Sequence, residues 1–280
     1  MTGAAGFIAR HLRPALEQNC DHVIAVDRSA GDVELQETWA ALPAAKIVVH
    51  LAGKSFVPAS WADPATHIRA NLSGVLGALE YCRQHHARLV FLSSYLYGTP
   101  TQLPIPETAT VHATNPYAFS KQLAEEACRF YADHFGVDVT VLRPFNAYGA
   151  GQGSSFLIPA IVQAVEARET IRVKDLEPRR DYVHVDDLVR AIVAATRGPA
   201  GFHVFNVGSG VSHSVADVID LVQQLWGTSL PVVSEGIRRT GEIMDTVADV
   251  SAAAGVLQWR PEISLADGLR RLRGTAGDSR

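Results

Sequence analysis

The sequence has little of several features that would mark particular classes of protein. Its three cysteines, Cys20, Cys82 and Cys128, lie far apart and show neither a C-x-x-C pair nor another metal-ligand spacing. We therefore expect free thiols in a reducing cytoplasm and no metal site. Basic residues do not outnumber acidic ones. The formal net charge of −4 argues against nucleic acid as the main partner.

Long hydrophobic runs and lysines are scarce as well. No apolar stretch approaches the roughly 18 residues of a membrane helix, and the first residues lack the basic-then-apolar order of a signal peptide. These absences predict a cytoplasmic protein without a membrane partner. Only Lys46, Lys54, Lys121 and Lys174 are lysines among 25 basic residues, so each lysine stands out against a background of arginine.

Apolar strands and helical segments alternate through the first half of the chain. The continuous apolar runs are typical of strands buried on both faces, and helical periodicity separates them. The predicted strands are residues 22–27, 46–53, 88–94 and 137–144, and the predicted helices are residues 6–19, 64–86 and 116–135. This order predicts an α/β fold with a doubly wound parallel (Rossmann) sheet.

The pattern changes after about residue 145. Helices are expected at residues 154–165 and 215–226, and short strands at residues 171–173, 203–208 and 230–234. We expect residues 1–145 to form a dinucleotide-binding domain, to which residues 181–208 return in part. Residues 146–280 would form mainly a smaller substrate lobe over the ends of the sheet strands, where ligands of such folds bind.

The chain begins MTGAAGFIAR, a glycine pattern typical of a dinucleotide-binding turn. Gly3 and Gly6 would allow a tight turn and close approach of a pyrophosphate to the next helix, with the small Ala9 at the third position. Asp27 lies 21 residues after Gly6, where an acid typically binds the adenosine ribose and favours NAD. The adjacent Arg28 could instead meet a 2′-phosphate, so NADP stays open.

The strand that normally precedes such a turn is truncated, because only Met1 and Thr2 stand before Gly3. One hypothesis is a start assigned too late in a gene that begins with GTG, so that the natural chain carries a few more apolar residues. The alternative is a genuine variant without this strand. That variant would leave two neighbouring strands with unpaired edges at the sheet centre.

The segment NPYAFSK places Tyr117 and Lys121 four residues apart, on one face of a helix. A tyrosine titrates near ~10, and a neighbouring ammonium or a cationic nicotinamide would lower that value. Tyr117 could then exchange a proton with a sugar oxygen that Ser93 also binds. Some Y-x-x-x-K arises by chance in roughly one such chain in ten. The scarcity of lysine nevertheless favours a functional pair over a solvated one.

Together these blocks resemble the extended short-chain dehydrogenase/reductases, specifically the nucleotide-sugar epimerase/dehydratase family. The similarity extends over nearly the whole chain. It rests on the segments TGAAGFIA, VVHLAG, LSSYLYG, NPYAFSK, LRPFNAYGAGQ, RRDYVHVDDLVRA, FNVGSG and RTGEIMDTVADVSAAAGVLQWRPEISLADGL.

The resemblance implies a set of site residues. The catalytic residues would be Ser93, Tyr117 and Lys121. Residues that would bind the cofactor are Gly3, Gly6, Phe7, Ile8, Asp27, Arg28, Asp32, Leu51, Ala52, Gly53, Asn71, Tyr117, Lys121 and Pro144. Residues that would bind the substrate, a nucleotide-diphosphate sugar, are Ser55, Ser94, Asn146, Arg180 and Arg239. Asp187 is expected to cap a helix rather than to touch ligand.

The family carries several reactions. Its dehydratases have an acid two positions after the catalytic serine or threonine, where this chain has Tyr95, so dehydration is disfavoured. We expect an NAD-dependent 4-epimerase, on the similarity of SSYLYG and Asp27 to epimerases. The alternatives are a 4-keto-6-deoxysugar reductase, suggested by HLAGKSFVPASW, and a dinucleotide-binding sensor without catalysis. Relatives pair helices like residues 64–86 and 116–135 between subunits, so a homodimer is expected.

Overall fold

A parallel sheet forms the centre of the fold. The computed structural model describes residues 1–237 and 242–277. Four strands lie in the order β1-β2-β3-β7, and all neighbours run parallel. They are β1 (Ile47–His50), β2 (Arg88–Leu92), β3 (Val139–Pro144) and β7 (Phe202–Val207). This arrangement confirms the predicted α/β fold with its parallel sheet.

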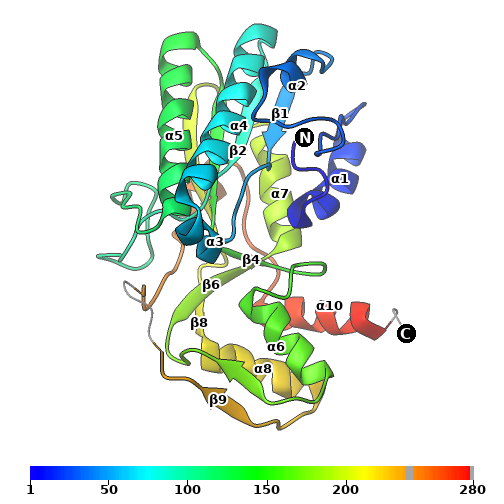
Figure 1. The fold of residues 1–280 in the computed structure, drawn as a ribbon, viewed down its shortest axis with the longest axis vertical. Coiled ribbons are helices and arrows are strands. Elements are labelled where there is room, and N and C mark those ends of the chain that lie inside the picture. The colour runs from blue at the N-terminus through cyan, green and yellow to red at the C-terminus, as the bar shows by residue number, and fades with distance from the viewer. Residues whose placement is uncertain (238–241, 278–280) are drawn as a thin grey trace.

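Helices cover both faces of this sheet, as Figure 1 shows. Alternate side chains of a strand point to opposite faces. Leu89 and Val141 therefore pack with α4 and α5, whereas Val90 and Leu142 pack with α1 and α7. The helices are α1 (Phe7–Asn19), α4 (Pro64–His85), α5 (Pro116–Phe135) and α7 (Val185–Ala195), joined by the short α2 (Gln36–Ala40), α3 (Val57–Ala62) and α9 (Ser251–Val256).

The first strand is reduced to a single bridging residue. Thr2 forms isolated parallel bridges to Val26 on one side and to His50 on the other. The Met1 carbonyl oxygen accepts a 2.8 Å hydrogen bond from the Val26 amide, and the Thr2 amide donates to the Val49 carbonyl oxygen at 3.0 Å. The prediction of a strand over residues 22–27 is therefore wrong except at Val26, because the neighbouring segment offers only Met1 and Thr2 for pairing.

Capping residues fix where α4 and α5 begin. The Asp63 side chain accepts a hydrogen bond from the Thr66 amide, and Pro64 follows it as the first helical residue. Asn115 likewise accepts from the Ala118 amide at 2.8 Å. Such caps satisfy amides that the first helical turn leaves free. The cap at Asn115 places Tyr117 in the first turn of α5, beside the ends of the strands.

A second group of elements lies below the sheet in Figure 1. The strands β4, β6 and β8 form one small sheet, and β5 pairs with β9. Helices α6, α8 and α10 lie alongside them, and these elements share a hydrophobic cluster of their own. The bounds are β4 (Asn146–Tyr148), α6 (Leu157–Glu166), β5 (Ile171–Val173), β6 (Arg179–His184), β8 (Ser212–Ser214), α8 (Val215–Trp226), β9 (Val232–Ser234) and α10 (Leu265–Gly277). The division into domains at residue 145 stays a prediction.

None of the helices in the described part of the chain is long and apolar enough to cross a membrane.

Candidate active site

Segments that are distant in sequence meet where the central strands end. Leu51, Ala52 and Gly53 follow β1, Ser93 and Ser94 follow β2, and Pro144 is the last residue of β3. Because the strands are parallel, their carboxyl ends lie at one edge of the sheet, the usual ligand edge of such folds. The glycine turn and the first turn of α5 lie at the same edge.

The turn before α1 has the backbone geometry that a pyrophosphate site needs. Gly3 has φ +68°, and a Cβ at this position would stand 2.8 Å from the Ala52 backbone nitrogen. A Cβ on Gly6 would lie 3.0 Å from the Gly3 carbonyl oxygen. Gly6 precedes α1, and no side chain caps the helix. The amides of its first turn, at Phe7 and Ile8, are therefore free of side-chain partners, which suits an anion.

Three predicted ribose and adenine contacts follow the Val26 bridge. The Asp27 carboxylate is exposed and accepts hydrogen bonds from the Ser29 hydroxyl at 2.6 Å and the Ser29 amide at 2.9 Å. These hydrogen bonds lower the pKa of Asp27. Asp32 is exposed and accepts from the Glu34 amide at 3.0 Å, and Arg28 is also exposed. The side chains of Arg28 and Asp32 therefore lie at the protein surface.

Asn71 joins the segment after β1 to helix α5. Its side-chain oxygen accepts from the Lys54 amide at 2.8 Å. Its side-chain nitrogen donates to the Lys54 carbonyl oxygen at 3.0 Å and to the Ser120 hydroxyl at 2.8 Å. A Cβ on Gly53, which has φ +154°, would lie 2.7 Å from the Asn71 oxygen and 3.7 Å from Lys121 Nζ. Asn71 thus holds the loop after β1 close to the ammonium of Lys121.

Lys121 lies inside the protein, at the end of β2. Its ammonium donates to the Leu92 carbonyl oxygen at 2.8 Å and lies 4.7 Å from the centroid of the Phe91 ring. Burial lowers the pKa of Lys121 to about 8, an effect that Glu125 and Cys128 oppose. A lysine of this kind changes charge close to neutral pH.

The phenol of Tyr117 differs from the sequence-based expectation. Burial raises the pKa of Tyr117 to about 12, and a hydrogen bond with Ser94 only partly opposes the effect. The expectation that Lys121 lowers this pKa is wrong for the protein alone, because burial outweighs the other influences and the lysine ammonium donates to Leu92. A proton acceptor at this position therefore needs an additional positive charge nearby.

Ser93 has a partner that no local sequence pattern predicts. Its hydroxyl donates to Glu125 Oε1 at 2.5 Å, and Arg143 on β3 forms an ion pair with the same carboxylate at 2.6 Å. Glu125 lies four residues after Lys121, a helical spacing that could have drawn attention to it. Nothing in the linear sequence links it to Ser93 or Arg143, which come from neighbouring strands.

The predicted substrate residues occupy several separate elements. Asn146 on β4 donates to the Asp181 carbonyl oxygen at 3.3 Å. Arg180 on β6 pairs with Glu242 and donates to the Ile243 carbonyl oxygen at 2.6 Å. Ser55 is exposed in the loop before α3. Arg239 lies outside the described residues.

Two buried aspartates, Asp181 and Asp187, join separate segments of the chain. Helix α7 is capped by His184, so the expectation that Asp187 caps it is wrong. Asp187 instead accepts from the amides of Glu262 and Ile263, at 3.1 and 3.0 Å. Buried Asp181 accepts from the amides of residues 209, 210 and 248. Both carboxylates tie the C-terminal segment to the rest of the fold.

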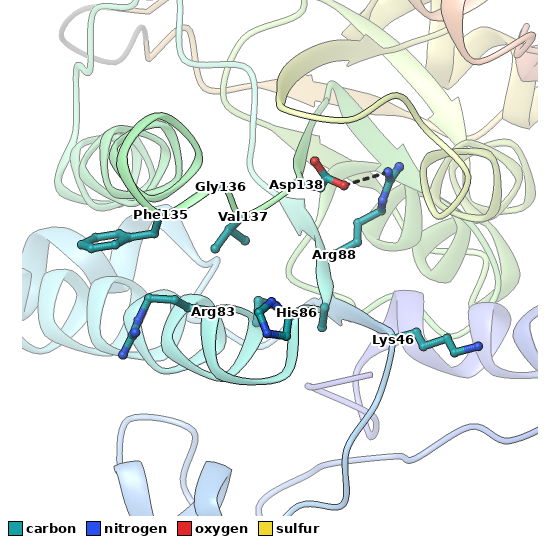
Figure 2. Close-up of a pocket in the computed structure, with 10 residues that line it drawn as sticks. Lys46, Arg83, His86, Arg88, Phe135, Gly136, Val137 and Asp138 are labelled. Carbon is teal, nitrogen blue, oxygen red and sulfur yellow. Dashed lines mark hydrogen bonds and ion pairs between the residues drawn. The ribbon is translucent and has the colours of Figure 1, made fainter.

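A surface pocket lies at the opposite, amino ends of β1, β2 and β3 (Figure 2). Figure 2 shows Lys46 and Arg83 on opposite sides of it, with their cationic ends pointing apart, while Arg88 pairs with Asp138 at 3.3 Å. Because these charges diverge or are paired, the pocket offers no convergent anion site. Within the described residues, no group of His, Cys, Asp and Glu is arranged to hold a metal ion.

Comparison with known proteins agrees with this geometry. Residues 1–208 match the model of the NAD dependent epimerase/dehydratase family. The chain is 31% identical over 290 residues to GDP-6-deoxy-D-mannose reductase of Pseudomonas aeruginosa, covering 97% of this chain and 94% of the reductase. Its fold matches UDP-glucose 4-epimerase of Thermotoga maritima, solved with UDP-glucose, with a TM-score of 0.90 and 27% identity over 99% of this chain and 98% of the epimerase. It matches MoeE5, in complex with UDP-glucose and NAD, with a TM-score of 0.91 and 30% identity over 99% and 98% of the two chains. The chain therefore belongs to the NAD-dependent epimerase/dehydratase family.

Proposed function

We propose that this protein is an NAD-dependent oxidoreductase that acts on a nucleotide-diphosphate sugar, most simply as a 4-epimerase. The observation that carries the proposal is the position of Tyr117 and Lys121 on one face of α5. They lie there beside the end of β2, directly before Ser93 and Ser94. Proton exchange at a sugar hydroxyl and a dinucleotide turn at the same sheet edge are what such a reaction requires.

The chain's own residues would hold the dinucleotide. Gly3 and Gly6 allow the tight turn that would bring a pyrophosphate to the free amides of α1, and a side chain at Gly3 would collide with the Ala52 backbone and displace this turn. The exposed Asp27 carboxylate suits the two hydroxyls of an adenosine ribose, which favours NAD. Arg28 next to it keeps NADP open. When bound, the oxidised nicotinamide supplies a hydride acceptor and a positive charge.

Tyr117 would take the proton from the sugar hydroxyl and return it later. Its pKa of about 12 in the protein alone keeps the phenol protonated until a positive charge arrives, so proton transfer is tied to an occupied site. The Lys121 ammonium, held by Leu92, supports the charge at this edge. Ser93 would hold the same sugar oxygen as Tyr117, and Ser94 would orient the phenol.

The choice between epimerase and reductase depends on the sugar. Tyr95 stands where dehydratases carry an acid, and it stacks on Phe145 with ring centroids 5.1 Å apart. This aromatic pair provides no carboxylate for the elimination of water. The similarity to an epimerase of known structure favours epimerisation. The 31% identity to a GDP-sugar reductase keeps reduction of a 4-keto-6-deoxysugar as the second candidate.

The test starts with the purified protein and any dinucleotide that accompanies it, identified by mass spectrometry. An epimerase holds NAD tightly and interconverts UDP-glucose and UDP-galactose without added cofactor. A reductase instead consumes NADH or NADPH in the presence of GDP-4-keto-6-deoxymannose. Absence of both activities, with several nucleotide sugars of each class, would reject the proposal.

Two further properties are proposed on physical grounds. Helices α4 and α5 pack together and expose Leu76, Phe119, Phe130 and Phe135, whose accessible fractions range from 36% to 53%. We infer that this surface pairs with a second copy of the chain, which light scattering after size exclusion would test. Cys20, Cys82 and Cys128 are free thiols, which agrees with a reducing compartment such as the cytoplasm.

A further inference from the structure

Glu125 occupies a central position beneath the proposed catalytic residues. It follows Lys121 by four residues and Tyr117 by eight, so all three side chains lie along one face of α5. Ser93 is 3% exposed, while Lys121, Glu125 and Arg143 are each 6% exposed. A carboxylate, an ammonium and a guanidinium are therefore gathered out of solvent, where their interactions are strong.

Both oxygens of Glu125 are engaged by defined partners. Oε1 accepts the Ser93 hydroxyl at 2.5 Å and Arg143 Nε at 3.1 Å. Oε2 accepts Arg143 Nη2 at 2.6 Å and Nε at 3.2 Å. Arg143 is held in turn by the Tyr97 hydroxyl at 2.9 Å, and Tyr97 donates to Asn206 Oδ1 at 2.6 Å. The carboxylate is thus fixed from α5, β2, β3 and β7.

The hydrogen bond from Ser93 to Glu125 positions the serine oxygen. A hydroxyl has one hydrogen and two acceptor positions. Because the Ser93 hydrogen points to Glu125, only the lone pairs of the Ser93 oxygen remain available at the carboxyl end of β2. The single hydrogen of the sugar hydroxyl goes to Tyr117, so Ser93 must turn its own hydrogen away from Glu125 to bind that sugar oxygen. The bond to Glu125 therefore fixes where the Ser93 oxygen lies before substrate binds.

We propose that Glu125 is a positioning residue for this reaction: it holds the Ser93 oxygen in place at the end of β2 and keeps Lys121 charged, in addition to pairing with Arg143. This inference rests on the proposed function of Ser93 and Lys121. The alternative is that Glu125 only stabilises the fold through the ion pair. The two differ in what happens when Glu125 and Arg143 are changed separately.

The first test measures Lys121 without any substrate. Labelling the four lysines with carbon-13 gives four NMR signals. The signal of Lys121 is that of the buried lysine, because Lys46, Lys54 and Lys174 are exposed. The other titratable groups that interact with its charge are Cys128 on the same helix and His50 at the end of β1. Glu125→Gln removes the negative charge near Lys121 and should lower the titration midpoint of the Lys121 ammonium by about one pH unit.

Arg143→Gln is the matched control for this titration. It breaks the same ion pair and also leaves one buried charge unpartnered, but it keeps the Glu125 carboxylate. The Lys121 midpoint should stay at or above that of the parent. If Glu125→Gln fails to fold, Glu125→Gln/Arg143→Gln leaves neither charge of the pair behind, and it should still titrate below Arg143→Gln. Equal midpoints in all variants would overturn the inference.

The second test is a double-mutant cycle on turnover, with UDP-glucose as the probe. Glu125→Gln should lower kcat about 100-fold with little change in KM, since misplacing a reacting group costs that much. At pH 6 Lys121 stays charged with or without Glu125. If Glu125 then acts through Ser93, adding Glu125→Gln to Ser93→Ala should lower kcat no further than Ser93→Ala alone at this pH. Additive losses, or an equal loss of kcat in Arg143→Gln, would show that Glu125 serves only the fold.

The two tests separate the possible failures. If the parent turns over no nucleotide sugar but the Lys121 midpoint shifts as expected, the proposed function fails and the control of Lys121 by Glu125 stands. If the parent is active and the midpoint does not move, the inference fails and the proposed function stands.

Discussion

The ammonium of Lys121 donates a 2.8 Å hydrogen bond to the carbonyl oxygen of Leu92, the last residue of β2. This bond fixes α5 to the end of the strand from which Ser93 follows directly. The same ammonium lies over the Phe91 ring, one residue earlier in the strand. The first turn of α5, with Tyr117, is therefore held in register with the end of β2.

Buried Lys121 predicts a loss of turnover on the alkaline side. Burial lowers its pKa to about 8, so the ammonium is present below this pH and is lost as the pH rises through it. We expect kcat to fall above pH 8 in a pH–rate profile. Lys121→Arg keeps a cation at high pH, so its residual activity should not show this decline. A parent profile that stays level to pH 10 would contradict the assignment.

The phenol of Tyr117 should be needed for turnover and not for folding. Tyr117→Phe removes the group that would exchange the proton, and we expect kcat to fall about 1,000-fold with the dinucleotide still bound. Tyr95→Phe is the matched control, because Tyr95 stacks on Phe145 through its ring and this variant keeps that ring. Steady-state kinetics and fluorescence of bound NADH measure the two effects. Similar losses in both variants, or an unchanged output from Tyr117→Phe, would favour a sensor without catalysis.

The parts of the site that were predictable depend on short-range patterns. Tyr117 and Lys121 were predictable because helical spacing places them on one face and lysine is rare in this chain. Gly3 was predictable because a positive φ leaves few alternatives to glycine. Each of these signals lies within a few residues of sequence.

The parts that were missed depend on contacts between distant segments. Ser93, Glu125 and Arg143 come from β2, α5 and β3, and no local pattern brings them together. The pKa of Tyr117 was misjudged because the spacing reveals Lys121 but not the degree of burial. The prediction of a strand over residues 22–27 was wrong for a related reason. The length of this strand depends on the segment around Thr2 with which it pairs, and not on its own apolar sequence.

A side chain at Gly3 should disrupt the dinucleotide turn. Gly3→Ala forces a residue with a Cβ into φ +68°, which costs about 1–2 kcal/mol, and brings that Cβ within 2.8 Å of the Ala52 nitrogen. The turn must then move, and we expect the Kd for NADH to rise at least about tenfold. Gly255→Ala is the control: Gly255 lies in α9 with nothing within 4 Å. That change should leave binding intact and stabilise the helix by about 0.5–1 kcal/mol.

Buried His50 should make the protein sensitive to acid. Its pKa is lowered from 6.5 to about 3, first by burial and then by the charges of Lys121 and the chain's amino group. Between these values the unfolded chain binds a proton that the folded chain does not, so stability falls as the pH decreases from 6.5 toward 3. The slope of stability against pH approaches about 1.4 kcal/mol per pH unit.

His50→Phe cannot take up this proton, and comparing it with the parent cancels the other titrating groups. Urea unfolding at pH 6.5 and 4.5 should show the parent losing about 2 kcal/mol more than the variant across this interval. Parallel losses in the two proteins would mean that His50 is protonated in the folded state.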